Sequence, residues 1–170
     1  ATLAASGAPK AVYVVNRFDV EVPGTVVDNG DYTSVQNLTN ETELARIGDA
    51  TTFEAEAGTL YYQGDAANAA LPWNVSLSYE LDGKKVEADQ LAGASGNLAV
   101  HVTTVRNEAV DPAFYDSFML QITFTLPGDV ASDVEGEGAT IAQSGEDATV
   151  AFTVLPGQDA DLTLTAKVRN

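Results

Sequence analysis

Cysteine is absent from the 170-residue sequence, and histidine and tryptophan each occur only once. Without cysteine the chain forms no disulfide bonds and offers no thiolate ligands to a metal ion. A single histidine also excludes metal sites built from histidine pairs. The fold must therefore be held together by packing and hydrogen bonds.

Basic residues are scarce: eight Lys and Arg stand against 25 Asp and Glu, which gives a formal net charge of −17 at pH 7. Nucleic-acid binding requires Lys and Arg to neutralise phosphates, so this charge argues against a DNA or RNA partner. It argues equally against direct docking on anionic lipid head groups. A self-repelling, soluble surface suits an extracellular or cation-rich setting.

Long apolar runs are also missing, and none approaches the roughly 20 residues that a membrane-spanning helix needs. The sequence shows no signal peptide, and it stops at Asn170 directly after an alternating run. We therefore expect an excised soluble part of a longer protein, and the alternative is a complete small protein whose signal peptide has been removed. Residues 1–9 are small and patternless, and we expect them to be a frayed lead-in.

Apolar residues make up 45% of the chain, enough for a real core, and they follow the two-residue period of β-strands. The pattern is clearest in residues 71–107. The apolar face of its first strand carries Val75, Leu77, Tyr79 and Leu81. Asp82-Gly83 then forms a turn pair, because both residues tolerate positive φ. A second strand alternates through Leu98, Val100 and Val102.

Similar strands recur along the chain and are separated by turns rich in Gly, Pro, Asp and Asn. No alternation of strands and helices is present, which excludes a parallel α/β enzyme sheet. We predict an all-β protein, with an immunoglobulin-like β-sandwich over residues 70–170 and a smaller β unit over residues 10–64. The small-residue stretch 64–70 is the predicted bridge between them.

One helical turn is predicted, over residues 40–45. Thr39 or Asn40 could cap it, and two glutamates fall in its first turn, where the helix dipole favours negative charge. This turn would carry Leu44 and Ile47 into the core.

His101, the only histidine, stands on the polar side of its strand. No Gly-x-Ser-x-Gly elbow accompanies it, so an ordinary strand residue is a better interpretation than a general base. Carboxylates are numerous enough to pair by chance, which leaves glycoside hydrolysis by two acids as the alternative function. We predict a non-enzymatic protein with no catalytic residue.

Two acidic segments could offer oxygen ligands to Ca²⁺. They are Asp28 with Asp31, and the segment that contains Asp129, Asp133, Glu135 and Glu137. Neither has the spacing of an EF-hand loop, and solvated turns are the simpler interpretation. We predict no cofactor-binding residue and no metal ligand, and calcium remains an open alternative.

Some bacterial surface sandwiches contain an internal amide bond between a lysine and an asparagine. The amines available here are Lys10, Lys84, Lys85 and Lys167. Ordinary surface lysines are the favoured interpretation, and the amide bond remains open.

Six aromatic residues cluster in sequence around the predicted bridge and the 108–118 loop: Tyr61, Tyr62, Trp73, Phe114, Tyr115 and Phe118. They could form a patch that binds a partner. The interpretation that we favour is that they seal the interface between the two β parts.

Several short phrases, spread over nearly the whole chain, carry a family resemblance: V-Y-V-V-N (12–16), G-T-V-V-D-N-G-D-Y (24–32), V-Q-N-L-T (35–39), Y-Y-Q-G (61–64), L-P-W-N-V (71–75), Y-E-L-D-G-K (79–84), L-A-G-A-S-G-N-L (91–98) and F-M-L-Q-I (118–122). Together they resemble the extracytoplasmic segment of Gram-positive membrane proteins related to the phage-infection-protein (Pip) family. The phrases consist of strand and turn residues, so no active residue carries over.

The resemblance implies a domain on the extracellular face of a bacterial membrane, tethered by segments that this chain lacks. It also implies phage attachment or export as family roles, with a protein, a cell-wall component or a phage component as partner. We therefore expect a non-enzymatic envelope module with a structural or recognition role. The alternative is a secreted carbohydrate-active or other hydrolytic domain that uses paired carboxylates.

Overall fold

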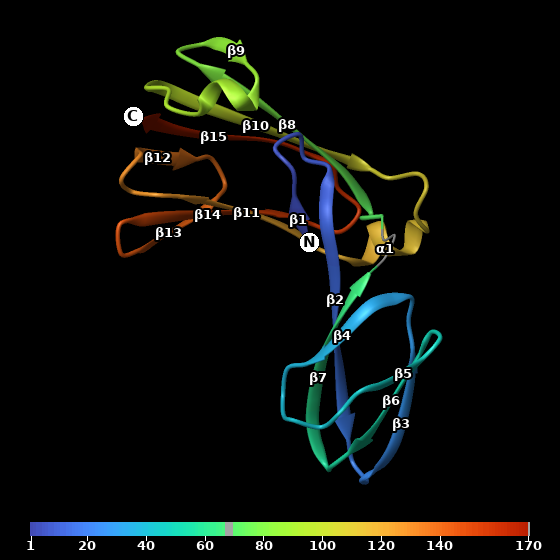
Figure 1. The fold of residues 1–170 in the computed structure, drawn as a ribbon. Helices are drawn as coiled ribbons and strands as arrows, with labels where there is room; N and C mark the ends of the chain where they lie inside the picture. The colour runs from blue at the N-terminus through green and yellow to red at the C-terminus, as the bar shows by residue number, and fades with distance from the viewer. Residues whose placement is uncertain (67–69, 170) are drawn as a thin grey trace. The chain divides into compact units, whose positions relative to one another are not determined.

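The computed structural model describes residues 1–66 and 70–169, which fold as two compact units (Figure 1). The first unit comprises Ala1–Thr2 and the chain from Pro9 to the end of β7 at Ala66. The second comprises Leu3–Ala8 and the chain from Ala70 onward. Most elements are antiparallel strands, which confirms the predicted all-β class. The predicted bridge begins inside β7, and its residues 67–69 lie outside the described residues.

Two small sheets build the first unit. The larger has the order β1-β2-β7-β4, with the bounds Thr2–Leu3, Pro9–Val20, Gly58–Ala66 and Tyr32–Asn37. The smaller has the order β3-β6-β5, with the bounds Gly24–Asn29, Ala50–Ala55 and Ala45–Ile47. The core forms around Tyr62, which is fully buried and stacks on Phe18 with ring centroids 5.5 Å apart. Phe53 packs edge-on against both rings.

The second unit is a β-sandwich. Its five-stranded sheet has the order β12-β15-β10-β8-β9, with the bounds Ala131–Gly136, Ala160–Val168, Gly96–Arg106, Trp73–Leu81 and Lys84–Val86. Its three-stranded sheet has the order β11-β14-β13, with the bounds Leu120–Leu126, Asp147–Val154 and Thr140–Ser144. Two short helices, η1 (Ala88–Leu91) and α1 (Pro112–Ser117), complete the unit.

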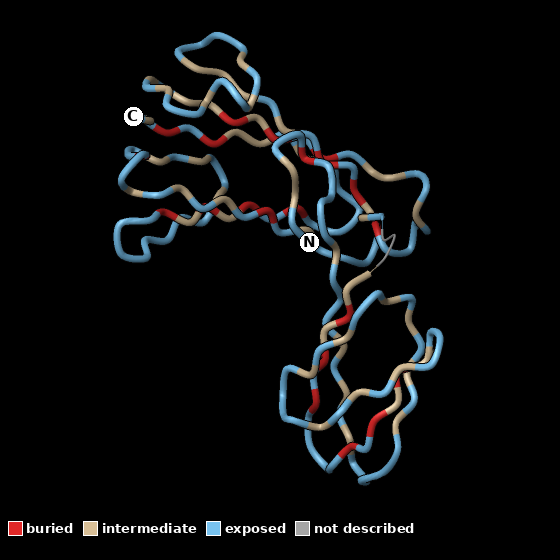
Figure 2. Tube along the Cα trace, viewed as in Figure 1, coloured by how far each residue is buried: buried red, intermediate tan, exposed pale blue. Residues whose placement is uncertain are grey.

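The core of the second unit lies between its two sheets. Val102 and Leu164 of the five-stranded sheet and Val150 and Phe152 of the three-stranded sheet are almost completely buried in one cluster. Figure 2 shows the buried positions following these central strands. The alternation predicted for β8 and β10 is present, and Asp82 and Gly83 both have positive φ in the turn after β8.

Residues 1–9, which we call the leading segment, are not frayed, contrary to the sequence expectation. The carbonyl of Ser6 accepts a hydrogen bond from the N–H of Leu77 at 3.0 Å, and Leu3 packs against the core of the second unit. Gly7 is buried with φ of +92°, and a Cβ at this position would lie 2.4 Å from the carbonyl oxygen of Val75. Only glycine fits such a close approach of two backbones.

The predicted helical turn over residues 40–45 is wrong. The side-chain oxygen of Asn37 accepts hydrogen bonds from the N–H groups of Thr39 and Asn40, and Asn40 in turn accepts from the N–H of Thr42. These side-chain bonds satisfy the backbone groups that a helix would use. Ile47 lies in β5 and is 85% exposed, not buried, whereas Leu44 packs against the core of the first unit.

Candidate functional site

The five-stranded sheet carries a polar groove of about 540 Å³ on the second unit. We call it the sheet groove. Its polar and small lining side chains are those of Glu80, Asn97, Ala99, Glu135, Thr165 and Lys167. They come from β8, β10, β12 and β15, whose opposite face packs into the core. The alternation of side chains along a strand therefore directs them away from the core, toward solvent.

Strand register sets the row of side chains across the groove. Ala99 on β10 pairs with Glu80 on β8 and with Thr165 on β15, and Thr165 pairs with Glu135 on β12. All four side chains therefore stand on one line across the sheet. Ala99 is the smallest of them, so it forms a low floor between longer neighbours.

One rim of the groove is an ion pair between Lys167 Nζ and a carboxylate oxygen of Asp133, 2.8 Å apart. Asp133 lies in a β-bulge with φ of +50°, in the left-handed region. The hydrogen bond that Lys167 donates to Asp133, together with the negative charge of Asp133, raises the pKa of Lys167. The Lys167 side chain is 65% exposed although it is ion-paired. The other three lysines named above are exposed.

His101 lies beside the groove, on the outer side of β10 as predicted. Its Nδ1 lies 3.3 Å from Thr163 Oγ1, and its Nε2 lies 3.6 Å from Glu80 Oε1. The second distance is too long for a hydrogen bond, so this contact is an electrostatic one that requires a protonated ring. The arrangement places a polar side chain next to Glu80.

Two glutamates stand on opposite sides of the groove. Glu80 and Glu135 lie on β8 and β12, with β10 and β15 between them. Three strand spacings separate their backbones by roughly 14 Å. The groove therefore offers hydrogen-bonding groups that are spread over a rigid surface.

The carboxylates that could have bound calcium do not gather. Among residues 1–66 and 70–169, no group of three or more His, Cys, Asp or Glu side chains is placed to hold a metal ion. Asp28 accepts a hydrogen bond from the hydroxyl of Tyr62, and Asp133 pairs with Lys167. Two of the candidate ligands are thus occupied by partners within their own units.

The six aromatic residues divide between the units. Tyr61 and Tyr62 belong to the first unit, and the other four belong to the second. Tyr62, Trp73 and Tyr115 are buried in the cores of their own units, so they are not available for a surface patch. Phe114 and Phe118 are about half exposed, with ring centroids 5.3 Å apart, and Tyr61 is 38% exposed.

Trp73 and Tyr115 form a buried pair with a structural role. Their ring centroids lie 5.3 Å apart, and the indole N–H of Trp73 donates to the carbonyl of Gln158 at 2.9 Å. The Tyr115 hydroxyl donates to Asp159 Oδ1 at 2.8 Å. Burial, followed by this hydrogen bond, raises the pKa of Tyr115. Sequence reasoning missed Asp159, because its partner is 44 residues away along the chain.

Comparison with protein-family models, curated proteins and solved structures gives no significant match. Within the part of the chain that the structure describes, no helix has the length and apolar character needed to span a membrane.

Proposed function

We propose that this chain is a non-enzymatic extracytoplasmic module of a bacterial cell-envelope membrane protein, and that its role is recognition. The observation that carries the recognition role is the sheet groove. Its side chains stand on four neighbouring strands, so the hydrogen-bonded ladder holds their relative positions. Binding groups placed on strands are held more accurately than groups placed on loops.

The chemistry of the groove favours a polar partner. Glu80 and Glu135 accept hydrogen bonds, Lys167 donates, and Asn97 and Thr165 can do both. A cell-wall glycan or a polar protein surface offers the matching hydroxyl and amide groups. The net charge of −17 also indicates that the partner is not itself strongly acidic, because like charges repel each other.

We also propose that the sandwich of the second unit is of the immunoglobulin-like type. The chain passes from β10 in the larger sheet to β11 in the smaller, back to β12, then to β13 and β14, and returns to β15. Repeated crossing between two antiparallel sheets is typical of such sandwiches, as is a buried tryptophan in the core. Trp73 at the start of β8 is the tryptophan in question.

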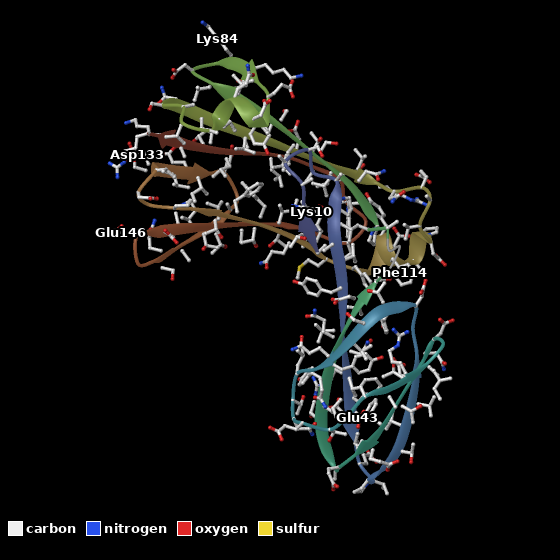
Figure 3. The ribbon with its side chains drawn as sticks, viewed as in Figure 1. Lys10, Glu43, Lys84, Phe114, Asp133 and Glu146 are labelled. Carbon is white, nitrogen blue, oxygen red and sulfur yellow. The ribbon has the colours of Figure 1, made fainter. Side chains whose placement is uncertain are left out.

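The extracytoplasmic location is tested by cysteine labelling, since the native chain has no cysteine. Lys84→Cys in the second unit and Glu43→Cys in the first change two exposed side chains (Figure 3). In the protein as its host makes it, a membrane-impermeant maleimide should label both variants on intact cells. The unsubstituted protein gives the background. Labelling only after cell lysis would contradict the proposal.

A further inference from the structure

A second, smaller pocket of about 260 Å³ lies in the second unit, where β10 begins and β15 ends. We call it the end pocket. Its apolar lining comes from Leu91, Ala94, Leu98, Val130 and Val168. Gly93 adds backbone, and Arg169 is the only charged residue in the lining. The end pocket is distinct from the sheet groove, because Leu98 is the one residue that lines both.

The apolar lining continues from the core of the sandwich. Leu98 is half-buried and packs against the core cluster, whereas Val130 just before β12 is 41% exposed. Leu91 comes from η1, which closes one side of the pocket. Covering apolar surface of this kind contributes about 25 cal/mol per Å². An apolar ligand group therefore gains free energy by entering the end pocket.

Backbone carbonyls hold the side chain of Arg169, and no acidic side chain among residues 1–66 and 70–169 pairs with it. Its Nε donates to the carbonyl of Asp129 at 3.0 Å, and its Nη2 donates to the carbonyl of Gly128 at 3.2 Å. Its backbone N–H donates to the carbonyl of Val130 at 2.9 Å. Guanidinium carries five N–H donors, so three remain for a ligand.

The absence of an ion-pair partner for Arg169 among the described residues contrasts with the composition of the chain. Acidic residues outnumber basic ones by 25 to 8, yet no carboxylate of the described residues forms an ion pair with Arg169. A fixed guanidinium beside an apolar cavity is complementary to a carboxylate with an apolar body, because two parallel N–H···O bonds can form. A neutral or cationic ligand cannot form these charge-assisted bonds with the exposed guanidinium.

We propose that the end pocket binds a small apolar carboxylate, with its hydrocarbon body against Leu91, Leu98 and Val168 and its carboxylate on Arg169. Water takes about 30 Å³ per molecule, and a 150 Å³ cavity accepts benzene. A pocket of about 260 Å³ therefore accepts a body of roughly eight carbon atoms. Two sources offer this chemistry: a short fatty acid and the C-terminus of a polypeptide with an apolar last residue.

The test is a titration of ¹⁵N-labelled chain with sodium octanoate, followed by amide chemical shifts. We expect saturable shifts at Leu91, Leu98, Val168 and Arg169. Octanol and octylamine are the matched ligands without a carboxylate, and both should bind at least about tenfold more weakly. Equal binding of octanol and octanoate, or the absence of saturable shifts, would overturn the proposal.

Two variants test separately how the charge of Arg169 and the volume of the cavity contribute to binding. Arg169→Gln should weaken octanoate binding about tenfold or more, whereas Arg17→Gln, an exposed arginine of the first unit, should leave it unchanged. Ala94→Leu should abolish binding by filling the cavity, and a dispersed amide spectrum shows that each variant is folded. Unchanged affinity of Arg169→Gln would overturn the proposal.

A further titration with peptides identifies the source of the carboxylate ligand. Acetyl-Gly-Leu-Leu with a free C-terminus is compared with its C-terminal amide and with octanoate. If the free acid binds about tenfold better than octanoate, the ligand is a polypeptide C-terminus, and the reverse order assigns a fatty acid. Equal binding of the peptide acid and its amide would argue against the role of Arg169.

Discussion

Tyr62 donates its phenolic hydrogen to the carboxylate of Asp28, and this bond joins the two sheets of the first unit. Tyr62→Phe keeps the ring packing and removes the hydroxyl. We expect a loss of about 1.5–3 kcal/mol in the free energy of unfolding of the first unit, the usual range for a hydrogen bond to a charged group. Urea denaturation followed by circular dichroism measures it. Tyr61→Phe, at an exposed neighbour, should stay within about 0.5 kcal/mol of the unsubstituted chain.

The same tyrosine predicts a loss of stability at alkaline pH. Burial, and then the hydrogen bond and charge of Asp28, raise the pKa of Tyr62 far above its ordinary value of about 10. The folded state thus keeps the proton that the unfolded state releases. The stabilisation is complete below about pH 10 and decreases as the pH rises further. Urea midpoints at pH 8.5 and pH 10.5 should differ more for the unsubstituted chain than for Tyr62→Phe. An equal difference would assign the alkaline effect to other groups.

The strands of the second unit could be predicted because their signal is local. β8 and β10 alternate apolar and polar residues, and each faces the core with the predicted side. The order of the strands could not be predicted. The pairing of β15 with both β10 and β12 depends on contacts between residues far apart in the sequence. The sheet groove depends on that register, since Glu80, Thr165 and Glu135 meet only when the sheet forms.

A substitution at Gly7 tests the role of the leading segment. Gly7→Ala would place a Cβ 2.4 Å from the carbonyl oxygen of Val75, at a φ of +92° that L-residues rarely adopt. We expect a loss of about 1–3 kcal/mol in the stability of the second unit. Trp73 fluorescence during urea unfolding reports on this unit, because it is the only tryptophan and is buried there.

The matched control for this substitution is Gly24→Ala. Gly24 begins β3, and no atom lies within 4 Å of an added Cβ. Its φ lies outside the left-handed region, so alanine should be neutral or slightly stabilising. Equal effects of the two substitutions would mean that the leading segment contributes nothing to the second unit.

The predicted helical turn at 40–45 and the observed helix α1 show where local signals mislead. The stretch 40–45 has a cap and acidic residues, but the side chain of Asn37 takes over the backbone groups. The real helix, α1, begins with Asp111 as N-cap and Pro112 in its first turn, and Asp111 accepts from the N–H of Ala113 at 2.9 Å. That signature was present in the sequence and is typical of a helix start. The burial of Tyr115 beneath it depends on Trp73 and Asp159, which the local pattern does not reveal.

The recognition role makes a prediction about the floor of the sheet groove. Ala99→Tyr places a bulky side chain in the sheet groove, between Glu80 and Thr165, on the face of the sheet that points to solvent. Folding should be preserved, because tyrosine is favoured in strands and the core side of β10 is unchanged. Thr103→Tyr is the matched control, since Thr103 is exposed on the same face of the same strand and does not line the groove.

Binding is measured with the purified chain and two probes: isolated Gram-positive cell-wall sacculi and immobilised envelope proteins from the same cells. We expect the unsubstituted chain and Thr103→Tyr to be retained on one of the probes, and Ala99→Tyr to be retained at least about tenfold more weakly, because a filled pocket excludes its ligand. Equal retention of both tyrosine variants would move the binding surface away from the groove. If the unsubstituted chain is retained on neither probe, the recognition role is wrong, and a structural role within the envelope protein takes its place.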